Sequence, residues 1–193
     1  MFHFSLFMGQ QCTKLDGEPF RHPPETILSD RQPLKVHKRH GENIALSATR
    51  DTAIRSEMNY SDGLVFSNRP VANGEWFCVQ VKQVTKKWKG DLSLGFTSHD
   101  PSTLDRPLPK TACPELSGQA GFWAKPLPVT INQEDTCIHF YVEYNGKIKW
   151  WLNDKDKGVF LRGVDTREPL WALVDLYGNC TRIQISETCK LVD

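Results

Sequence analysis

The residues that could perform catalysis in this sequence are six cysteines and six histidines, and their spacing favours no active site. The cysteines are widely scattered, and none forms the C-x-x-C pair that zinc-binding modules commonly use. His37 and His40 are three residues apart, but no second pair of ligands accompanies them. The G-x-S-x-G, G-x-x-x-x-G-K-[ST] and H-E-x-x-H motifs are absent. We predict that this chain is not an enzyme and uses no metal or cofactor, although spacing alone leaves a Cys–His pair open.

Recognition of a partner through aromatic side chains is the chemistry that the sequence favours instead. Trp88 is surrounded by lysines in the run K-K-W-K-G at residues 86–90. Because tryptophan is enriched at binding hot spots, Trp88 could anchor an acidic or aromatic peptide. The alternative, which we favour, is that its indole folds back onto the core while the lysines stay in water.

Other polar and aromatic residues near predicted loops complete the candidate binding set. Arg69 and Asp100 could each face a ligand or pair with each other across a turn, and we favour a structural role because Asp-Pro commonly opens turns. Trp151 alternates with Trp150, so one of the two should face away from the core. Loops concentrate recognition residues. The candidate partner-binding residues are therefore Tyr60, Arg69, Trp88, Asp100, Trp123, Trp151 and Tyr177.

The overall charge and hydropathy exclude some classes of partner. The 24 Lys and Arg residues nearly balance the 23 Asp and Glu residues, which gives a formal net charge of +1. A nucleic-acid-binding domain normally has a basic excess, so we expect no nucleic-acid partner. No apolar run is long enough to span a membrane. We expect a soluble cytoplasmic protein in which Cys78 and Cys137 are buried, reduced thiols.

Short runs that alternate apolar and polar residues follow one another from residue 34 onward. The clearest occupies residues 137–153, where two alternating runs flank Asn145-Gly146, a dipeptide that favours a two-residue type I′ hairpin turn. Many short strands at fairly even spacing, without a useful helical period, predict an all-β fold. We predict a two-sheet antiparallel β-sandwich.

Three further segments give more specific structural predictions. The runs 172–177 and 181–186 are expected to pair with each other around Gly178-Asn179. The brief run 63–66 is expected to place Leu64 and Phe66 towards the core. Six prolines break residues 100–136 into loops, and the aromatic residues within this stretch predict that it packs against the domain.

The chain ends are predicted to lie outside the folded domain. Residues 1–33 are rich in proline and polar residues and should form a flexible leader, and residues 189–193 should form a short tail. Residues 8–13 (M-G-Q-Q-C-T) fit the N-myristoylation pattern. If translation starts at Met8, Gly9 could be acylated and Cys12 palmitoylated, which would allow peripheral membrane association. Chance remains the alternative explanation of so short a pattern.

Several blocks between residues 34 and 188 occur in an order that resembles the neuralized homology repeat. In chain order they are His37-x-x-x-Gly41-x-Asn43-Ile44-x-Leu46-Ser47, Gly63-Leu64-Val65-Phe66-Ser67-x-Arg69-Pro70, Gly74-Glu75, Trp88-x-Gly90-x-Leu92-x-Leu94-Gly95-Phe96-Thr97-x-x-Asp100-Pro101, Leu108-Pro109, Cys113-Pro114-Glu115-Leu116, Trp123, Leu127-Pro128, Gly163-Val164-Asp165, Pro169-Leu170-Trp171-Ala172 and Asp175-Leu176-Tyr177-Gly178. The ordered set is specific, although each block alone would be weak. Val36 departs from the pattern, since an aromatic residue usually precedes the histidine.

The resemblance implies a SPRY-like β-sandwich at residues 34–188 that recognises protein targets, among them the cytoplasmic tails of Notch ligands. It is strongest to small neuralized-like ubiquitin ligases, in which a catalytic RING follows a single repeat. The cysteine spacing here provides no RING. We therefore expect a substrate-recognition module of a ubiquitin-ligase system. The alternatives are a fragment or isoform of a RING ubiquitin ligase and, with less support, a carbohydrate-binding sandwich.

Overall fold

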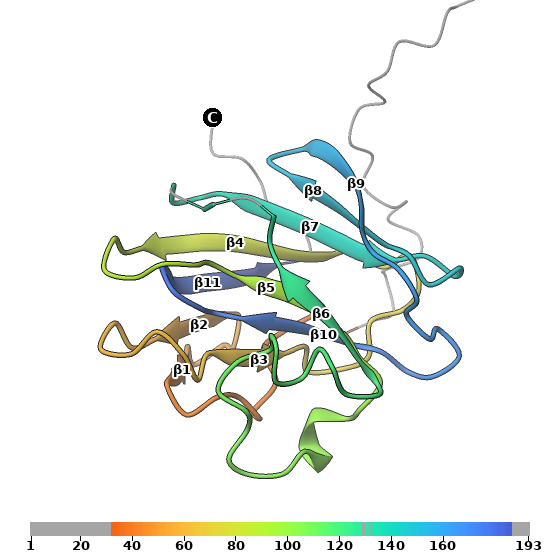
Figure 1. Cartoon of the computed structure of the whole chain (residues 1–193), viewed down its shortest axis with the longest axis horizontal. Coiled ribbons are helices and arrows are strands. Elements are labelled where there is room, and N and C mark those ends of the chain that lie inside the picture. Colours follow the sequence, from red (N-terminus) through yellow and green to blue (C-terminus); the bar gives the residue numbers. More distant parts are fainter. Residues whose placement is uncertain (1–31, 129, 132, 187–193) are drawn as a thin grey trace, which may run out of the picture.

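The computed structural model describes residues 32–128, 130–131 and 133–186 (Figure 1). The leader at residues 1–33 falls outside this range except for its last two residues, and the tail at residues 189–193 and the acylation candidates Gly9 and Cys12 also lie outside it. Eleven strands occur in the described residues, together with one 3-10 turn, η2 (Pro101–Thr103). None of the described residues belongs to a helix long and apolar enough to cross a membrane.

The strands form two antiparallel sheets, which confirms the predicted all-β sandwich. In spatial order, the larger sheet contains β1 (Ile44–Leu46), β2 (Thr52–Arg55), β11 (Cys180–Ser186), β4 (Phe77–Val84), β7 (Cys137–Val142), β8 (Ile148–Leu152) and β9 (Lys155–Leu161). The smaller sheet contains β3 (Leu64–Phe66), β10 (Trp171–Asp175), β5 (Ser93–Thr97) and β6 (Phe122–Pro126). Figure 1 shows the smaller sheet lying across the face of the larger one.

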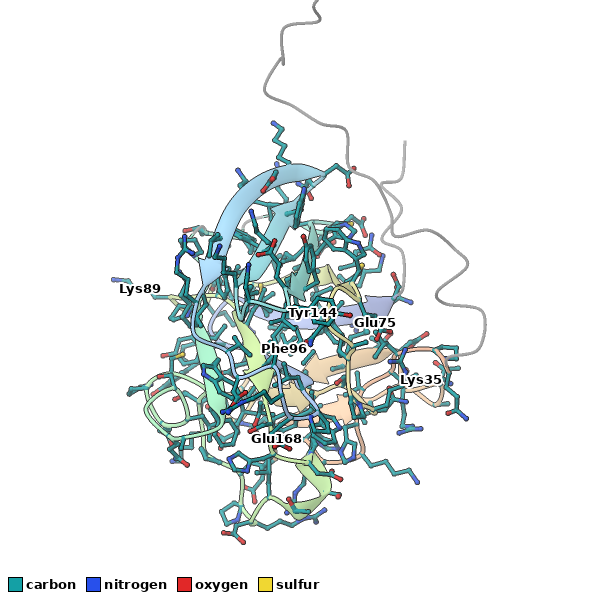
Figure 2. All side chains as sticks on the ribbon, turned by 90° about the vertical axis from the view of Figure 1, so that its right-hand side faces the viewer. Lys35, Glu75, Lys89, Phe96, Tyr144 and Glu168 are labelled. Atoms are coloured by element: carbon teal, nitrogen blue, oxygen red, sulfur yellow. The ribbon has the colours of Figure 1, made fainter. Side chains whose placement is uncertain are left out.

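The core lies between the two sheets and follows from the period-2 alternation of their strands. Phe140 on β7 contacts Phe77 on β4 and Phe96 on β5, with ring centroids 5.3 and 5.4 Å apart. Figure 2 shows Phe96 in the interior of the sandwich. Edge-to-face contacts of this kind add to the stabilisation from the buried apolar area. These aromatic contacts join the two sheets at the centre of the domain.

A second apolar cluster covers the outer face of the smaller sheet and corrects one prediction. Leu64 and Phe66 point to this outer face, whereas Val65 between them faces the central core. The loop between β5 and β6 folds over them and contributes Leu108 and Leu116. The loop is therefore packed against the domain, as predicted. Because the apolar residues of this loop cover the outer face of β3, both faces of the strand are buried. Alternation alone therefore could not show which face of β3 points to the central core.

The sequence predicted a two-residue type I′ turn at Asn145-Gly146, before β8, but the structure places the two-residue turn after β8. Glu143 pairs with Lys147 across a three-residue loop, and of the two predicted turn residues only Gly146 has a positive φ, +75°. The two-residue turn occurs instead between β8 and β9, where Asn153 and Asp154 have φ of +46° and +62°. Two central residues with φ > 0 are the requirement of a type I′ turn.

The predicted pairing of residues 172–177 with 181–186 is wrong, because the two runs belong to different sheets. β10 pairs with β3 and β5, whereas β11 pairs with β2 and β4. The chain therefore crosses between the sheets at Gly178-Asn179. The strands β2 and β9 were not predicted, because β2 is short and partly polar and β9 has an exposed, lysine-rich first half at the edge of the sheet.

Candidate functional site

Three of the seven predicted binding residues meet at one end of the sandwich. The Trp88 ring lies 5.3 Å from the Tyr60 ring, and the Tyr60 ring lies 5.6 Å from the Tyr177 ring in an edge-to-face arrangement. We call Tyr60, Trp88 and Tyr177 the aromatic cluster. They come from three separate loops, β2–β3, β4–β5 and β10–β11. The tertiary structure therefore joins residues that lie far apart in the sequence.

Hydrogen bonds between these loops hold the aromatic cluster in place. The indole Nε1–H of Trp88 donates to the carbonyl oxygen of Glu57 at 3.3 Å, and its backbone N–H donates to Oδ1 of Asn179 at 3.1 Å. The N–H of Gly178 donates to the carbonyl of Tyr60 at 3.1 Å. Loops that are already ordered lose less conformational entropy when they bind a partner. The three rings of the cluster are thus held in one arrangement by the loops that carry them.

Arg55, at the end of β2, supports the same loops from the interior of the domain. Its side chain is 1% exposed, and its guanidinium donates to the carbonyls of Asn59 and Gly178, which precede Tyr60 and follow Tyr177. It also donates to the carbonyls of Ser56 at 3.0 Å and Cys180 at 3.3 Å. Sequence reasoning missed Arg55 because β2 was not predicted and because a buried arginine resembles a surface one in sequence.

Asp175 is the buried acidic group that accompanies Arg55. Its Oδ2 accepts a hydrogen bond from the backbone N–H of Ala112 at 2.8 Å. Burial raises the pKa of Asp175 to about 6, while the Ala112 N–H and the charge of Arg55 oppose that rise. A carboxyl group shifted by desolvation in this way is common at both functional and structural sites. Because Asp175 is buried and bonded to the backbone of Ala112, we assign it a structural role.

The surface around the aromatic cluster combines apolar atoms with positive charge. Met58 is 86% exposed and Tyr60 is 45% exposed, both high values for large apolar side chains. Lys87 forms an ion pair with Glu57 at 2.7 Å and lowers the pKa of that carboxyl group. Lys86 and Lys89 are exposed on the same loop, and Figure 2 shows Lys89 extending away from the body of the domain. This surface can contact apolar side chains and attract acidic ones.

Arg69 and Asp100 do not pair with each other and lie away from the aromatic cluster. The Arg69 guanidinium donates to both carboxylate oxygens of Glu75, at 3.1 and 2.7 Å. Asp100 caps η2, where its Oδ1 accepts hydrogen bonds from the backbone N–H and the hydroxyl of Ser102, both at 2.8 Å. Each side chain is therefore engaged in local structure.

Trp123 and Trp151, which the sequence placed in or beside loops, both lie in strands, and for Trp151 this agrees with the alternating run predicted at residues 137–153. Trp123 is on β6 opposite Phe96 and packs against the central core. Trp151 is on β8, and its ring lies 4.6 Å from the Trp76 ring on the outer face of the larger sheet. Trp150 points into the core, so the predicted opposition of Trp150 and Trp151 is confirmed.

A Cys–His pair is present, but it is buried. The Sγ atom of Cys78 lies 3.0 Å from Nδ1 of His139, and both residues are 0% exposed. Burial lowers the pKa of His139, which the neighbouring Asp154 carboxylate opposes. A substrate in solution cannot reach either atom in this arrangement. Among the described residues, no group of three or more His, Cys, Asp and Glu side chains is placed to hold a metal ion.

The fold and the loops define the class of protein, a β-sandwich that presents a preformed aromatic surface on its interstrand loops. A Neuralized family model matches residues 36–187, and the chain belongs to the Neuralized family. Protein neuralized of Drosophila melanogaster is 41% identical over 156 residues, 81% of this chain and 21% of that protein. The human E3 ubiquitin-protein ligase NEURL3 is 32% identical over 157 residues, 80% of this chain and 60% of that protein.

The solved structures agree with this assignment. The crystal structure of the Drosophila melanogaster neuralized NHR1 domain superposes with a TM-score of 0.79 at 40% sequence identity. The match covers 82% of this chain and 100% of that chain. The chain thus spans one NHR domain, and about a fifth of the length of the fly relative.

Proposed function

We propose that this chain is the substrate-recognition module of a ubiquitin-ligase system and that it binds a segment of another protein at the aromatic cluster. The observation that carries the proposal is the exposure of Met58 and Tyr60 on loops fixed by Arg55 and by main-chain hydrogen bonds. Exposed aromatic anchors on a rigid support are the usual centres of binding energy in protein interfaces.

The target and the ubiquitin-transfer step extend this proposal. The family resemblance implies the cytoplasmic tail of a Notch ligand as one target. Transfer of ubiquitin would require a RING domain, supplied either by a longer form of the protein or by a separate ligase. A carbohydrate ligand is less well supported, because Glu57, an acidic group beside the cluster, is already paired with Lys87.

Calorimetric titration of the full chain with a Notch-ligand tail peptide tests the proposal. We expect binding in the micromolar range, weakened roughly tenfold by Met58→Ala or Tyr60→Ala, as for hot-spot truncations. Tyr144→Ala is the matched control, because Tyr144 is 81% exposed at the opposite end of the sandwich. Equal losses for the control and the cluster variants would overturn the assignment of the site. Absence of binding would remove the Notch-ligand target.

A further inference from the structure

A cleft of about 440 Å³ opens on the side of Trp88 towards the end of β6. It is lined by Trp88, by buried Leu92 and Leu127 and by exposed Pro126 and Pro128. We call it the Trp88 cleft. Its volume falls within the usual range for sites that hold a ligand group. Apolar and polar atoms share its lining about equally, and the cleft is open to solvent on one side. A single apolar side chain would be partly shielded from water there.

The polar side chains that line the Trp88 cleft are those of Lys89, Asp91, Thr130 and Asn179. Asn179 uses its side-chain oxygen to accept the Trp88 N–H, which leaves its amide –NH₂ to face a ligand. Lys89 lines the cleft as well. Asp91 is the acidic residue of the lining. Its Oδ2 accepts the N–H of Ile131 at 3.2 Å, whereas its buried Oδ1 has no hydrogen-bond partner among the described residues. Burial raises the pKa of Asp91, which reflects the poor solvation of its charged form.

The β4–β5 loop places a local excess of positive charge beside this cleft. Lys87 is paired with Glu57, but within residues 32–128, 130–131 and 133–186 neither Lys86 nor Lys89 forms an ion pair. The chain as a whole is almost neutral, with a net charge of +1, so this excess is local. Such an arrangement attracts acidic groups to one place rather than to an extended basic face.

We propose that the partner segment is acidic and inserts one apolar side chain into the Trp88 cleft, with its flanking carboxylates beside Lys86 and Lys89. This inference rests on the proposed function and specifies the chemistry of the segment that the module recognises. Trp88, Leu92 and the prolines of the cleft select the anchor, and the two lysines select the flanks. A membrane surface or a nucleic acid would require a broader basic face than one loop provides.

Fluorescence anisotropy with synthetic peptides tests the proposal directly. The probe is a labelled twelve-residue peptide with a central phenylalanine flanked by Asp and Glu, compared with a Lys-flanked version and a version with alanine at the centre. We expect the full chain to bind the acidic phenylalanine peptide about tenfold or more tightly than either comparison peptide, with a dependence on salt. Equal binding of the acidic and Lys-flanked peptides, or no binding of any peptide, would overturn the proposal.

Two sets of variants separate the charge from the cleft. The double variant Lys86→Glu/Lys89→Glu should weaken binding of the acidic peptide at low salt, whereas the matched double variant Lys155→Glu/Lys157→Glu, on exposed positions of β9, should not. Thr130→Trp should fill the Trp88 cleft and remove the advantage of phenylalanine over alanine. Tighter binding to phosphatidylserine vesicles than to the acidic peptide, with the same lysine dependence, would also reject the proposal.

The outcomes distinguish this inference from the function on which it rests. A partner whose binding is weakened by Met58→Ala but not by Lys86→Glu/Lys89→Glu or Thr130→Trp would keep the recognition function and reject an acidic segment in the cleft. A partner that is insensitive to all of these substitutions would reject both.

Discussion

Arg55 and Asp175 lie buried within electrostatic range of each other, and each is 1% exposed. Arg55 holds the loops that carry the aromatic cluster, whereas Asp175 holds the backbone of Ala112 in the loop that covers the smaller sheet. One buried charge pair therefore connects the candidate binding surface to the packing on the outer face of the smaller sheet. Loss of Arg55 would leave the Asp175 carboxylate buried without its nearby cation, whereas loss of Asp175 would leave Arg55 with its carbonyl acceptors alone.

Replacement of Arg55 should therefore destabilise the domain strongly. Arg55→Met removes the donors to four carbonyl groups and leaves Asp175 uncompensated. We expect a loss of about 3–5 kcal/mol in the free energy of unfolding, measured by urea denaturation. Arg167→Met is the matched control, because Arg167 pairs with Asp165 at the surface and should change little. Similar losses for the two variants would contradict the role assigned to Arg55.

The raised pKa of Asp175 predicts a pH dependence of stability with a definite sign. In the folded domain the pKa of Asp175 is about 6, against 3.8 for an aspartate carboxyl group in water. The contribution of this group to stability is therefore complete below about pH 3.8 and is lost as the pH rises through about 6. The difference between these two pKa values corresponds to roughly 3 kcal/mol in the free energy of unfolding.

Asp175→Asn isolates that contribution, because an amide oxygen can still accept the Ala112 N–H but does not titrate. Urea denaturation of both proteins at a series of pH values between about 4 and 7 gives the difference in their free energies of unfolding. We expect the wild-type protein to lose stability relative to the variant as the pH rises. A difference that is independent of pH would show that Asp175 does not titrate in this range.

Gly178 should resist substitution because the chain crosses between the sheets there. Its φ is +58°, and a Cβ atom would collide with the carbonyl oxygens of Lys89 and Gly90. Gly163 also has a positive φ, +85°, but a Cβ atom there would have open space. In Gly163→Ala only the positive φ is unfavourable, whereas Gly178→Ala adds a steric clash. We therefore expect Gly178→Ala to lower the free energy of unfolding by at least ~2 kcal/mol more than Gly163→Ala. Comparable losses would argue against the close approach.

The cysteines of the described residues should differ in their reactivity. Cys113 is half-buried, whereas Cys78, Cys137 and Cys180 are buried, and burial raises the pKa of Cys180 to about 12. Because the thiolate is the reactive form, a variant with Cys12 and Cys189 changed to serine should react with iodoacetamide mainly at Cys113. Peptide mass spectrometry before and after denaturation measures this order. Early labelling of Cys180 would contradict its burial.

The candidate site was only partly predictable from the sequence. The aromatic residues Tyr60, Trp88 and Tyr177 were identified individually, because aromatic side chains near loops are a local signal. Met58 was missed, since nothing in its neighbours distinguishes an exposed methionine from a buried one. Trp151 lies in an alternating run that the sequence predicted, whereas Trp123 lies on β6, in a stretch that its prolines predicted to consist mainly of loops.

Side-chain alternation is enough to predict an all-β sandwich with its main core on β4, β5, β7 and β8, because it depends only on adjacent residues. The tertiary structure decided which sheet each strand joins, and so separated β10 from β11. It also brought Arg55 to the carbonyl of Gly178, 123 residues away along the chain. Contacts over such distances depend on the packing of the whole domain, and they turned three scattered aromatic residues into one surface.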